Sequence, residues 1–167
     1  MVHHRAFTIA AAIFLIGQTS GAAADTADAA AVVNAPYANL QWKRTVPELG
    51  ERSSEMVILH TDPVTKSTQL MIRFPPNYHM PAHWHSANET HTVIEGTFIV
   101  EAAGKRAELA KGSFNYTPAK LPHEAWTPPG EGALVYMTMD AADDIHWVNG
   151  DPKPQDYGPG LAARAAD

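Results

Sequence analysis

The stretch that decides the interpretation of this chain reads Pro81-Ala82-His83-Trp84-His85-Ser86-Ala87-Asn88-Glu89-Thr90-His91. Four of the nine histidines of the chain fall between His79 and His91. Side chains two residues apart on a β-strand point to the same face, so His83 and His85 should present their imidazoles together. This spacing predicts a strand that contributes two ligands to one metal ion.

The residues that follow supply a carboxylate. If residues 86–88 form a three-residue hairpin loop, Glu89 lies directly opposite His85 on the next strand, with Cβ atoms about 5 Å apart. A carboxylate beside two imidazoles is a usual ligand group for a divalent metal. The same register places His91 opposite His83, so we expect His91 to lie beside the site.

Beyond this stretch, short segments rich in β-branched, aromatic and aliphatic residues alternate with turn signals. The 13 prolines and 11 glycines are spread in short breaks, which suits many brief strands better than a few long helices. The sequence predicts an all-β fold, a small antiparallel β-barrel that closes to protect its edges. The clearest predicted strands are residues 56–60, 68–74, 90–95, 97–102, 105–110, 112–116 and 133–139.

The spacing of these residues resembles the two motifs of the cupin superfamily. The first motif is matched by His83, His85, Glu89 and Gly96, with Asn77 in place of the leading glycine. The second is matched by Gly112, Pro118 and His123, with Lys120 in place of a glycine and Thr127 in place of an asparagine. Asparagine adopts left-handed turns more readily than most residues, so Asn77 fits its position. The resemblance implies a jelly-roll, or double-stranded β-helix, that holds one divalent metal ion on His83, His85, Glu89 and His123.

Three functions are compatible with such a site. Three imidazoles and one carboxylate leave coordination positions open to water, dioxygen or a chelating substrate. By family resemblance, the first expectation is a metal-dependent dioxygenase acting on a small phenolic, enol or keto substrate. The alternatives are a redox-neutral lyase or isomerase and a non-catalytic envelope protein that binds a ligand or a metal. Iron or manganese suits oxygen chemistry best, whereas nickel, copper and zinc also suit this ligand set.

His91 is the candidate catalytic residue, because it should face the ion without matching a ligand position. In cupin-type lyases of dimethylsulfoniopropionate, a tyrosine two residues after the glutamate is the base, and His91 occupies that place. Histidine suits proton transfer because its unperturbed pKa lies near neutrality. His91 is thus a general base, a fifth metal ligand or a hydrogen-bond partner of Glu89.

The ends of the chain predict an exported protein. A basic start, an apolar stretch of about a dozen residues and the small residues 22–24 are typical of a secretory signal peptide, residues 1–24, cleaved after Ala24. The apolar stretch is shorter than the roughly 20 residues that span a membrane. An alanine-rich tether (25–39), a barrel domain (40–148) and an extended or disordered tail (149–167) follow. The mature protein should be periplasmic or secreted, without stable membrane insertion.

Composition limits the partners. The formal net charge is −6, and removing Arg5 with the signal makes it −7, which argues against a nucleic-acid partner. Without cysteine, the chain forms no disulfide and offers no thiolate to a metal. A small-molecule substrate or ligand is the expected partner, and a homodimer is the default assembly.

Several other residues could take part in a site. Aromatic and methionine side chains at Phe114, Tyr116, Trp126, Met137 and Met139 could line a substrate pocket, but in a small barrel we expect them to fill the core. Arg73 should face solvent, because Leu70, Ile72 and Phe74 share the other face of its strand. The acidic run of Asp140, Asp143 and Asp144 is interpreted as a solvated loop rather than a calcium site. No role is assigned to His60, His79 or His146.

Overall fold

The computed structural model describes residues 32–158, so the predicted signal peptide and residues 25–31 of the predicted tether lie outside the described part. Within that part, ten strands and three short 3-10 helices follow one another, and no helix is long and apolar enough to cross a membrane. The elements are η1 (Tyr37–Asn39), β1 (Lys43–Arg44), η2 (Pro47–Arg52), β2 (Glu55–Thr61), β3 (Thr68–Phe74), β4 (His79–Trp84), β5 (Glu89–Ala102), β6 (Lys105–Ala110), β7 (Phe114–Thr117), β8 (His123–Trp126), β9 (Ala133–Met139), β10 (His146–Trp147) and η3 (Pro154–Tyr157).

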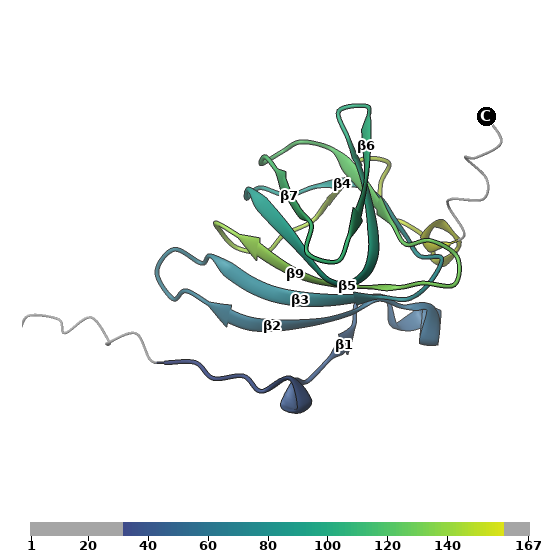
Figure 1. Cartoon of the computed structure of the whole chain (residues 1–167). Helices are drawn as coiled ribbons and strands as arrows, with labels where there is room; N and C mark the ends of the chain where they lie inside the picture. The colour runs from purple at the N-terminus through teal and green to yellow at the C-terminus, as the bar shows by residue number, and fades with distance from the viewer. Residues whose placement is uncertain (1–31, 159–167) are drawn as a thin grey trace, which may run out of the picture. The chain divides into compact units, whose positions relative to one another are not determined.

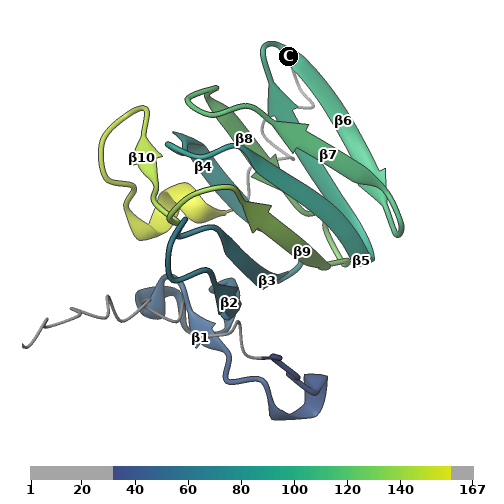
Figure 2. The same cartoon turned by 90° about the vertical axis from the view of Figure 1, so that its left-hand side faces the viewer.

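The strands form a single antiparallel sheet that curls into a half-barrel (Figures 1 and 2). The order of strands is β1-β2-β3-β9-β5-β8-β4-β10, with β6 and β7 paired to β5 as well. Strands β1, β2 and β3 are consecutive in sequence, but β3 pairs with β9 and β5 pairs with β8, so distant segments become neighbours in the rest of the sheet. The predicted all-β, antiparallel, jelly-roll fold is therefore confirmed, with a sheet that is curled rather than closed.

Strand β5 connects the two halves of the curled sheet. Its first part, to Gly96, pairs with β9, and its second part pairs with β6 and β8. Gly96 lies at the change of direction with a φ of 72°, and a Cβ atom there would lie 1.9 Å from the backbone oxygen of Gly132. A glycine is required because both the left-handed backbone and the close approach exclude a side chain.

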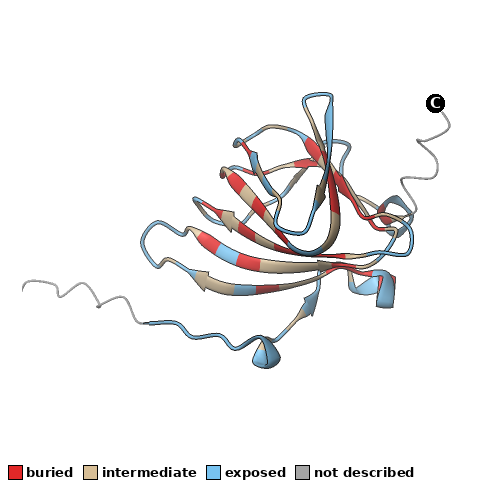
Figure 3. Ribbon diagram, viewed as in Figure 1, coloured by how far each residue is buried: buried red, intermediate tan, exposed pale blue. Residues whose placement is uncertain are grey.

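The inner face of the half-barrel carries the hydrophobic core, and the outer face is more exposed (Figure 3). In the centre, the rings of Phe74 on β3 and Phe98 on β5 stack with centroids 5.3 Å apart. Leu70, Met137 and Met139 form a second cluster toward the other end of the sheet. Burying these side chains favours the curling; on β3, for example, the inward Leu70, Ile72 and Phe74 alternate with outward residues such as Gln69 and Arg73.

Differences from the predicted strands have local causes. The segments 90–95 and 97–102 are one strand, because Gly96 bends β5 without ending it. The segment predicted from Gly112 begins at Phe114, since Gly112 has a φ of 85° and belongs to the preceding turn. The sequence interpretation did not identify β8 as a strand, because Leu121-Pro122 before it and Thr127-Pro128 after it leave only four residues.

The C-terminal segment extends the ordered domain beyond residue 148, where the sequence interpretation placed the start of an extended or disordered tail. Residues 154–157 form η3, and the ring of Tyr157 is buried in the core beside Tyr78. The imidazole of His79 lies with Nδ1 2.8 Å from the carbonyl oxygen of Asp156. The buried ring of Tyr157 and this hydrogen bond therefore help to attach the segment to the sheet.

Candidate metal centre

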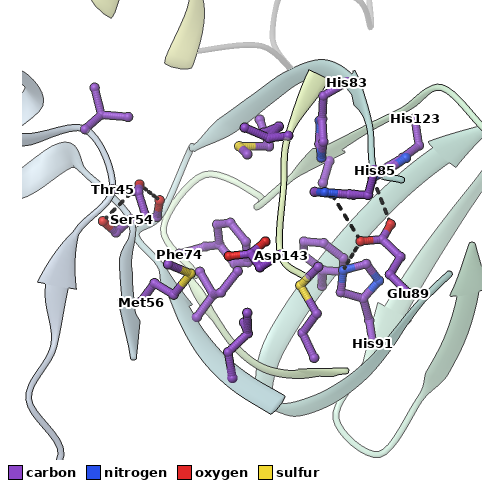
Figure 4. A pocket seen from close by; sticks show the side chains of 18 of the residues that line it. Thr45, Ser54, Met56, Phe74, His83, His85, Glu89, His91, His123 and Asp143 are labelled. Atoms are coloured by element: carbon purple, nitrogen blue, oxygen red, sulfur yellow. Dashed lines mark hydrogen bonds and ion pairs between the residues drawn. The ribbon is translucent and has the colours of Figure 1, made fainter. Parts of the chain in front are cut away.

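The structure brings together all five predicted site residues, although they come from three segments. His83 lies on β4 and His85 directly after it, Glu89 and His91 lie on β5, and His123 begins β8. The nitrogens of His83, His85 and His123 that face one another lie within 4.8 Å, so these three histidines are positioned to bind a metal ion. Nε2 of His85 and His123 lie 3.4 and 2.8 Å from the carboxylate of Glu89 (Figure 4).

The predicted hairpin between residues 83–85 and 89–91 is wrong. Strand β4 pairs with β8 and β10, where His83 lies opposite His123, whereas the start of β5 pairs with β9 and β7. The backbone oxygen of His85 accepts a hydrogen bond from the amide of Lys120, at 2.8 Å. Residues 85–88 thus cross between the two halves of the sheet, and Glu89 meets the histidines through the curl of the sheet.

His91 nevertheless lies beside the cluster, as predicted. It is on the same face of β5 as Glu89, two residues earlier, and its Nε2 lies 3.7 Å from a carboxylate oxygen of Glu89. Its Nδ1 lies 3.3 Å from Oδ1 of Asn115, which also accepts a hydrogen bond from Thr117. Since that oxygen is an acceptor, the Nδ1 of His91 is the donor, and its Nε2 is directed toward Glu89.

Backbone carbonyls fix the three clustered imidazoles in one tautomer. Nδ1 of His83 lies 2.7 Å from the oxygen of Pro81, and Nδ1 of His123 lies 3.0 Å from the oxygen of Leu121. Nδ1 of His85 is hydrogen-bonded to the backbone oxygen of Asp144. A carbonyl only accepts, so each Nδ1 carries the proton and each Nε2 is left to bind an ion.

The buried carboxylate of Glu89 supports the same conclusion. Only 1% of Glu89 is exposed, yet neither of its oxygens accepts a hydrogen bond of normal geometry. A buried carboxylate without hydrogen bonds is costly unless a cation lies beside it. Three imidazoles fixed with Nε2 inward and one such carboxylate form a donor set that suits a divalent transition metal.

Electrostatics keep the cluster ready for an ion. Burial lowers the pKa of His83 to about 3, and the neighbouring His123 and His85 add to this effect. Burial would raise the pKa of Glu89, but His91 and His123 outweigh it and lower the pKa to about 2. Burial acts against protonation of His123, yet the adjacent carboxylate of Glu89 raises its pKa overall. At neutral pH a charged carboxylate therefore faces a neutral His83, and the raised pKa of His123 reflects the attraction of this carboxylate for a positive charge, which a metal ion would also supply.

The cluster lies at one end of a cavity of about 210 Å³ inside the half-barrel (Figure 4). Most of its wall is apolar, with side chains from β2, β3, β5 and β9 such as Met56, Phe74 and Met137. Thr45 and Ser54 supply hydroxyl groups on another part of the wall, and their side-chain oxygens are hydrogen-bonded to each other. Such a cavity accommodates a small, largely apolar molecule with one end beside the histidines.

The other predicted residues divide between core and surface. Trp126, Met137 and Met139 are buried, as expected, and Met137 also lines the cavity. The expectation is wrong for Phe114 and Tyr116, which are 62% and 53% exposed, because their side chains lie on the outer face of β7. Arg73 does not line the cavity; its guanidinium stacks 3.7 Å from the ring centre of Trp42 on the outer face of the sheet.

The two non-glycine residues at motif glycine positions behave as their positions require. Asn77 has a φ of 57° and Lys120 a φ of 63°, so both adopt the left-handed conformation. Thr127, in place of the motif asparagine, is buried, accepts a hydrogen bond from the amide of Tyr78 and donates one to the oxygen of Pro75. The turns before β4 and β8 are therefore maintained despite these substitutions.

Sequence reasoning did not identify several residues that complete the site. Asp144 supplies the carbonyl that orients His85, Asn115 orients His91, and Tyr157 and Trp147 line the cavity. The expectation that His83 and His123 bind the same ion could have suggested that their strands, β4 and β8, are neighbours. Nothing in the local sequence indicates the roles of Asp144 or Tyr157, because both act across contacts with distant segments.

Comparison with known proteins agrees with this architecture. Residues 70–139 match the family model of the cupin domain. The polyketide cyclase RemF from Streptomyces resistomycificus is 18% identical with a TM-score of 0.60, and the match covers 74% of this chain and 90% of that one. KdgF from Halomonas sp. is 18% identical with a TM-score of 0.55, covering 65% and 94% of the two chains.

A third similar structure is the DMSP lyase DddQ from Ruegeria pomeroyi DSS-3, which is 14% identical with a TM-score of 0.59 over 70% of this chain and 64% of that one. No curated protein sequence gives a significant match. A curled antiparallel sheet with a buried histidine cluster on its inner face defines a small β-barrel protein with an internal site for a metal ion. Residues 70–139 thus resemble the cupin domain, and the curled sheet has the fold of the cupin structures to which it is similar.

Proposed function

We propose that this protein is a metal-dependent enzyme that acts on a small organic substrate by proton transfer, as a lyase or an isomerase. His83, His85, Glu89 and His123 would hold one divalent ion. When bound, the ion supplies a positive charge that polarises an oxygen atom of the substrate. The observation that carries the proposal is His91, a fourth buried imidazole that is beside the cluster but outside the set of three.

The environment of His91 suits a base. Burial lowers its pKa, while the charge of Glu89 and the hydrogen bond to Asn115 act in the opposite direction. The imidazole is therefore neutral at neutral pH, and its Nε2, which has no proton in this tautomer, is the atom that accepts one. His91 also lines the cavity, so its ring borders the space that a bound molecule would occupy. Asn115 keeps the ring oriented while the proton is held.

Exchange of an activated C–H hydrogen tests this function without knowledge of the natural substrate. Hydroxyacetone in D₂O offers a carbonyl and a hydroxyl that chelate a metal, and hydrogens that exchange through the enol. We expect the zinc- or manganese-loaded protein to accelerate this exchange, measured by NMR, and His91→Gln to reduce the acceleration by roughly 100-fold or more. Equal exchange rates in the two proteins, at equal metal content, would exclude His91 as the base.

A dioxygenase is the second candidate. Its support is the combination of three neutral-tautomer imidazoles and one carboxylate with an apolar cavity, which suits iron or manganese and an oxygen-sensitive substrate. Oxygen uptake by the iron-loaded protein with phenolic, enol and keto compounds separates this activity from proton transfer. A ligand that binds tightly and is recovered unchanged would instead favour an envelope binding protein.

We also propose that the protein is exported, with cleavage after Ala24. The support is the sequence of residues 1–24, which has the basic, apolar and small-residue regions of a signal peptide. Determination of the N-terminal residue of the protein in its native host tests the proposal. A mature chain that begins at Asp25 is the expected result, and a chain that retains residues 1–24 would contradict it.

A further inference from the structure

The segment between β9 and β10, residues 140–145, forms a strap beside the metal centre. Asp140 accepts a hydrogen bond from the amide of Asn88, at 2.9 Å, and Asp144 accepts one from the amide of Ser86, at 2.8 Å. The strap is thereby attached to the crossing segment 85–88, which carries His85. The acidic run is thus more than a solvated loop, because two of its three carboxylates have structural partners.

The third carboxylate, Asp143, has no such role. It forms no hydrogen bond or ion pair with any residue of the described range 32–158, and it lines the cavity together with Ile145 of the same strap. Figure 4 shows its carboxylate in the cavity region, between the hydroxyl groups of Thr45 and Ser54 and the histidine cluster. A carboxylate that faces a cavity without a protein partner is available to a ligand.

The charge of the cavity wall indicates which ligand group would be favoured. Among the described residues, Asp143 and Glu89 are the carboxylates that line the cavity, and no lysine or arginine lines it. Glu89 would be neutralised by the metal ion, whereas the charge of Asp143 is left without a counterion. A second anionic group on the substrate would be repelled, and a cationic group would be attracted.

The surroundings of Asp143 increase this preference. Although the residue is exposed, desolvation by the surrounding atoms raises its pKa; His85 opposes the shift, and Asp144 and Glu89 reinforce it. A carboxylate that is partly desolvated interacts more strongly with a cation than one in bulk water. The rings of Phe74, Trp147 and Tyr157 also line the cavity and offer faces that attract a cation.

We propose that Asp143 binds a positively charged group of the substrate, so that the cavity selects small cationic or zwitterionic molecules whose other end binds the metal ion. This inference rests on the proposed metal-dependent function. It names a specificity-determining residue, and a substrate class that has an oxygen-containing chelating group, a short apolar chain and an ammonium-type group.

Two hydroxamic acids of equal length test the inference. 4-Aminobutanohydroxamic acid ends in an ammonium group and pentanohydroxamic acid in a methyl group, while both chelate a metal through the same head. Their Kd values for the zinc-loaded protein are measured by calorimetry for the wild type, for Asp143→Asn and for Glu108→Gln. Glu108 is exposed on β6 and does not line the cavity, so its variant controls for the loss of one negative charge.

We expect Asp143→Asn to shift the ratio of the two Kd values about tenfold against the ammonium compound, and Glu108→Gln to leave the ratio within about twofold. A ratio that is unchanged in Asp143→Asn, or that shifts equally in Glu108→Gln, would overturn the inference but leave the metal-dependent function intact. If the wild type retains no zinc or binds neither compound, both the proposed metal centre and the inference fail.

Discussion

Two histidine–carboxylate pairs of similar length occur in different regions of this molecule. Nε2 of His79 lies 2.9 Å from Glu124 near the surface, and Nε2 of His123 lies 2.8 Å from Glu89 in the interior. In the outer pair both ring nitrogens of His79 have partners, since the other nitrogen is hydrogen-bonded to the backbone oxygen of Asp156. The inner carboxylate is instead approached by three imidazoles and accepts no hydrogen bond of normal geometry from any of them.

This difference separates a structural histidine from a ligand. His79 stacks on the ring of Trp126, at 5.3 Å between centroids, and attaches η3 to the sheet, so its two nitrogens are fully used. The inner cluster leaves several nitrogens and two carboxylate oxygens converging on one volume. The histidine–carboxylate distance alone does not distinguish a structural histidine from a metal ligand. The distinction comes from whether the other polar atoms of the two residues have protein partners.

The largest expected effect is the loss of the metal ion when the inner histidines are removed. We expect the wild type, purified from its native compartment, to contain about one ion per chain and the His83→Ala, His85→Ala double variant to contain almost none. Elemental analysis measures both. The control is His79→Ala, which removes an imidazole of the outer pair and should retain the ion; equal metal contents in all three proteins would remove the distinction between the pairs.

A smaller effect is expected when each carboxylate is converted to its amide. Glu89→Gln removes the negative charge of the proposed site and should raise the Kd for Zn²⁺ by roughly 100-fold, a loss comparable to other substitutions around metal centres. The matched change Glu124→Gln should alter this Kd by less than about threefold, because that carboxylate pairs with His79, which lies outside the cluster. Competition with a fluorescent chelator gives both values, and similar losses would contradict the assignment of Glu89.

The smallest effect concerns acid stability without metal. Burial lowers the pKa of His83 to about 3, so below pH 6.5 the unfolded chain takes up a proton on this residue while the folded protein does not; the lowered pKa of His91 acts in the same direction. Stability must therefore fall as the pH decreases from 6.5 to 5, by roughly 1.4 kcal/mol per pH unit for each proton taken up. His123, whose pKa is raised, acts in the opposite direction, but its contribution is gained mostly above pH 6.5 and is constant once the unfolded chain is also protonated. Urea unfolding of the chelator-treated protein measures this dependence, and a stability that rises on acidification would contradict it.

The identity of the fold and the membership of the cluster were predictable from sequence because both depend on spacing along the chain. His83, His85 and Glu89 lie within seven residues of one another, and alternation along strands limits where their side chains point. The register was not predictable, since the backbone partner of His85 is Lys120, and no local pattern indicates that amide. A hairpin was the shortest connection compatible with the sequence. In the structure β4 pairs with β8 instead, and the start of β5 pairs with β9.

The sequence also did not predict which face of β7 is buried. Phe114 and Tyr116 alternate with polar residues in the manner of core side chains, yet they lie on the outer face of β7. In a curled sheet the inner face has room for few side chains, so an apolar pattern near an end of the sheet does not specify burial. The same limit applies to Tyr157, whose burial depends on the attachment of η3.

The hydrogen bond from His85 to the backbone of Asp144 connects the strap to the ion through thermodynamic linkage. Asp143 and Ile145 of the strap line the cavity, and the backbone oxygen of Asp144 between them holds the His85 ring in its tautomer. We expect an ion bound to His85 to stabilise the strap in this position, and by reciprocity a displaced strap to weaken the binding of the ion. The rate at which amide hydrogens of residues 140–145 exchange with solvent should therefore report metal occupancy, although no residue of the strap need touch the metal.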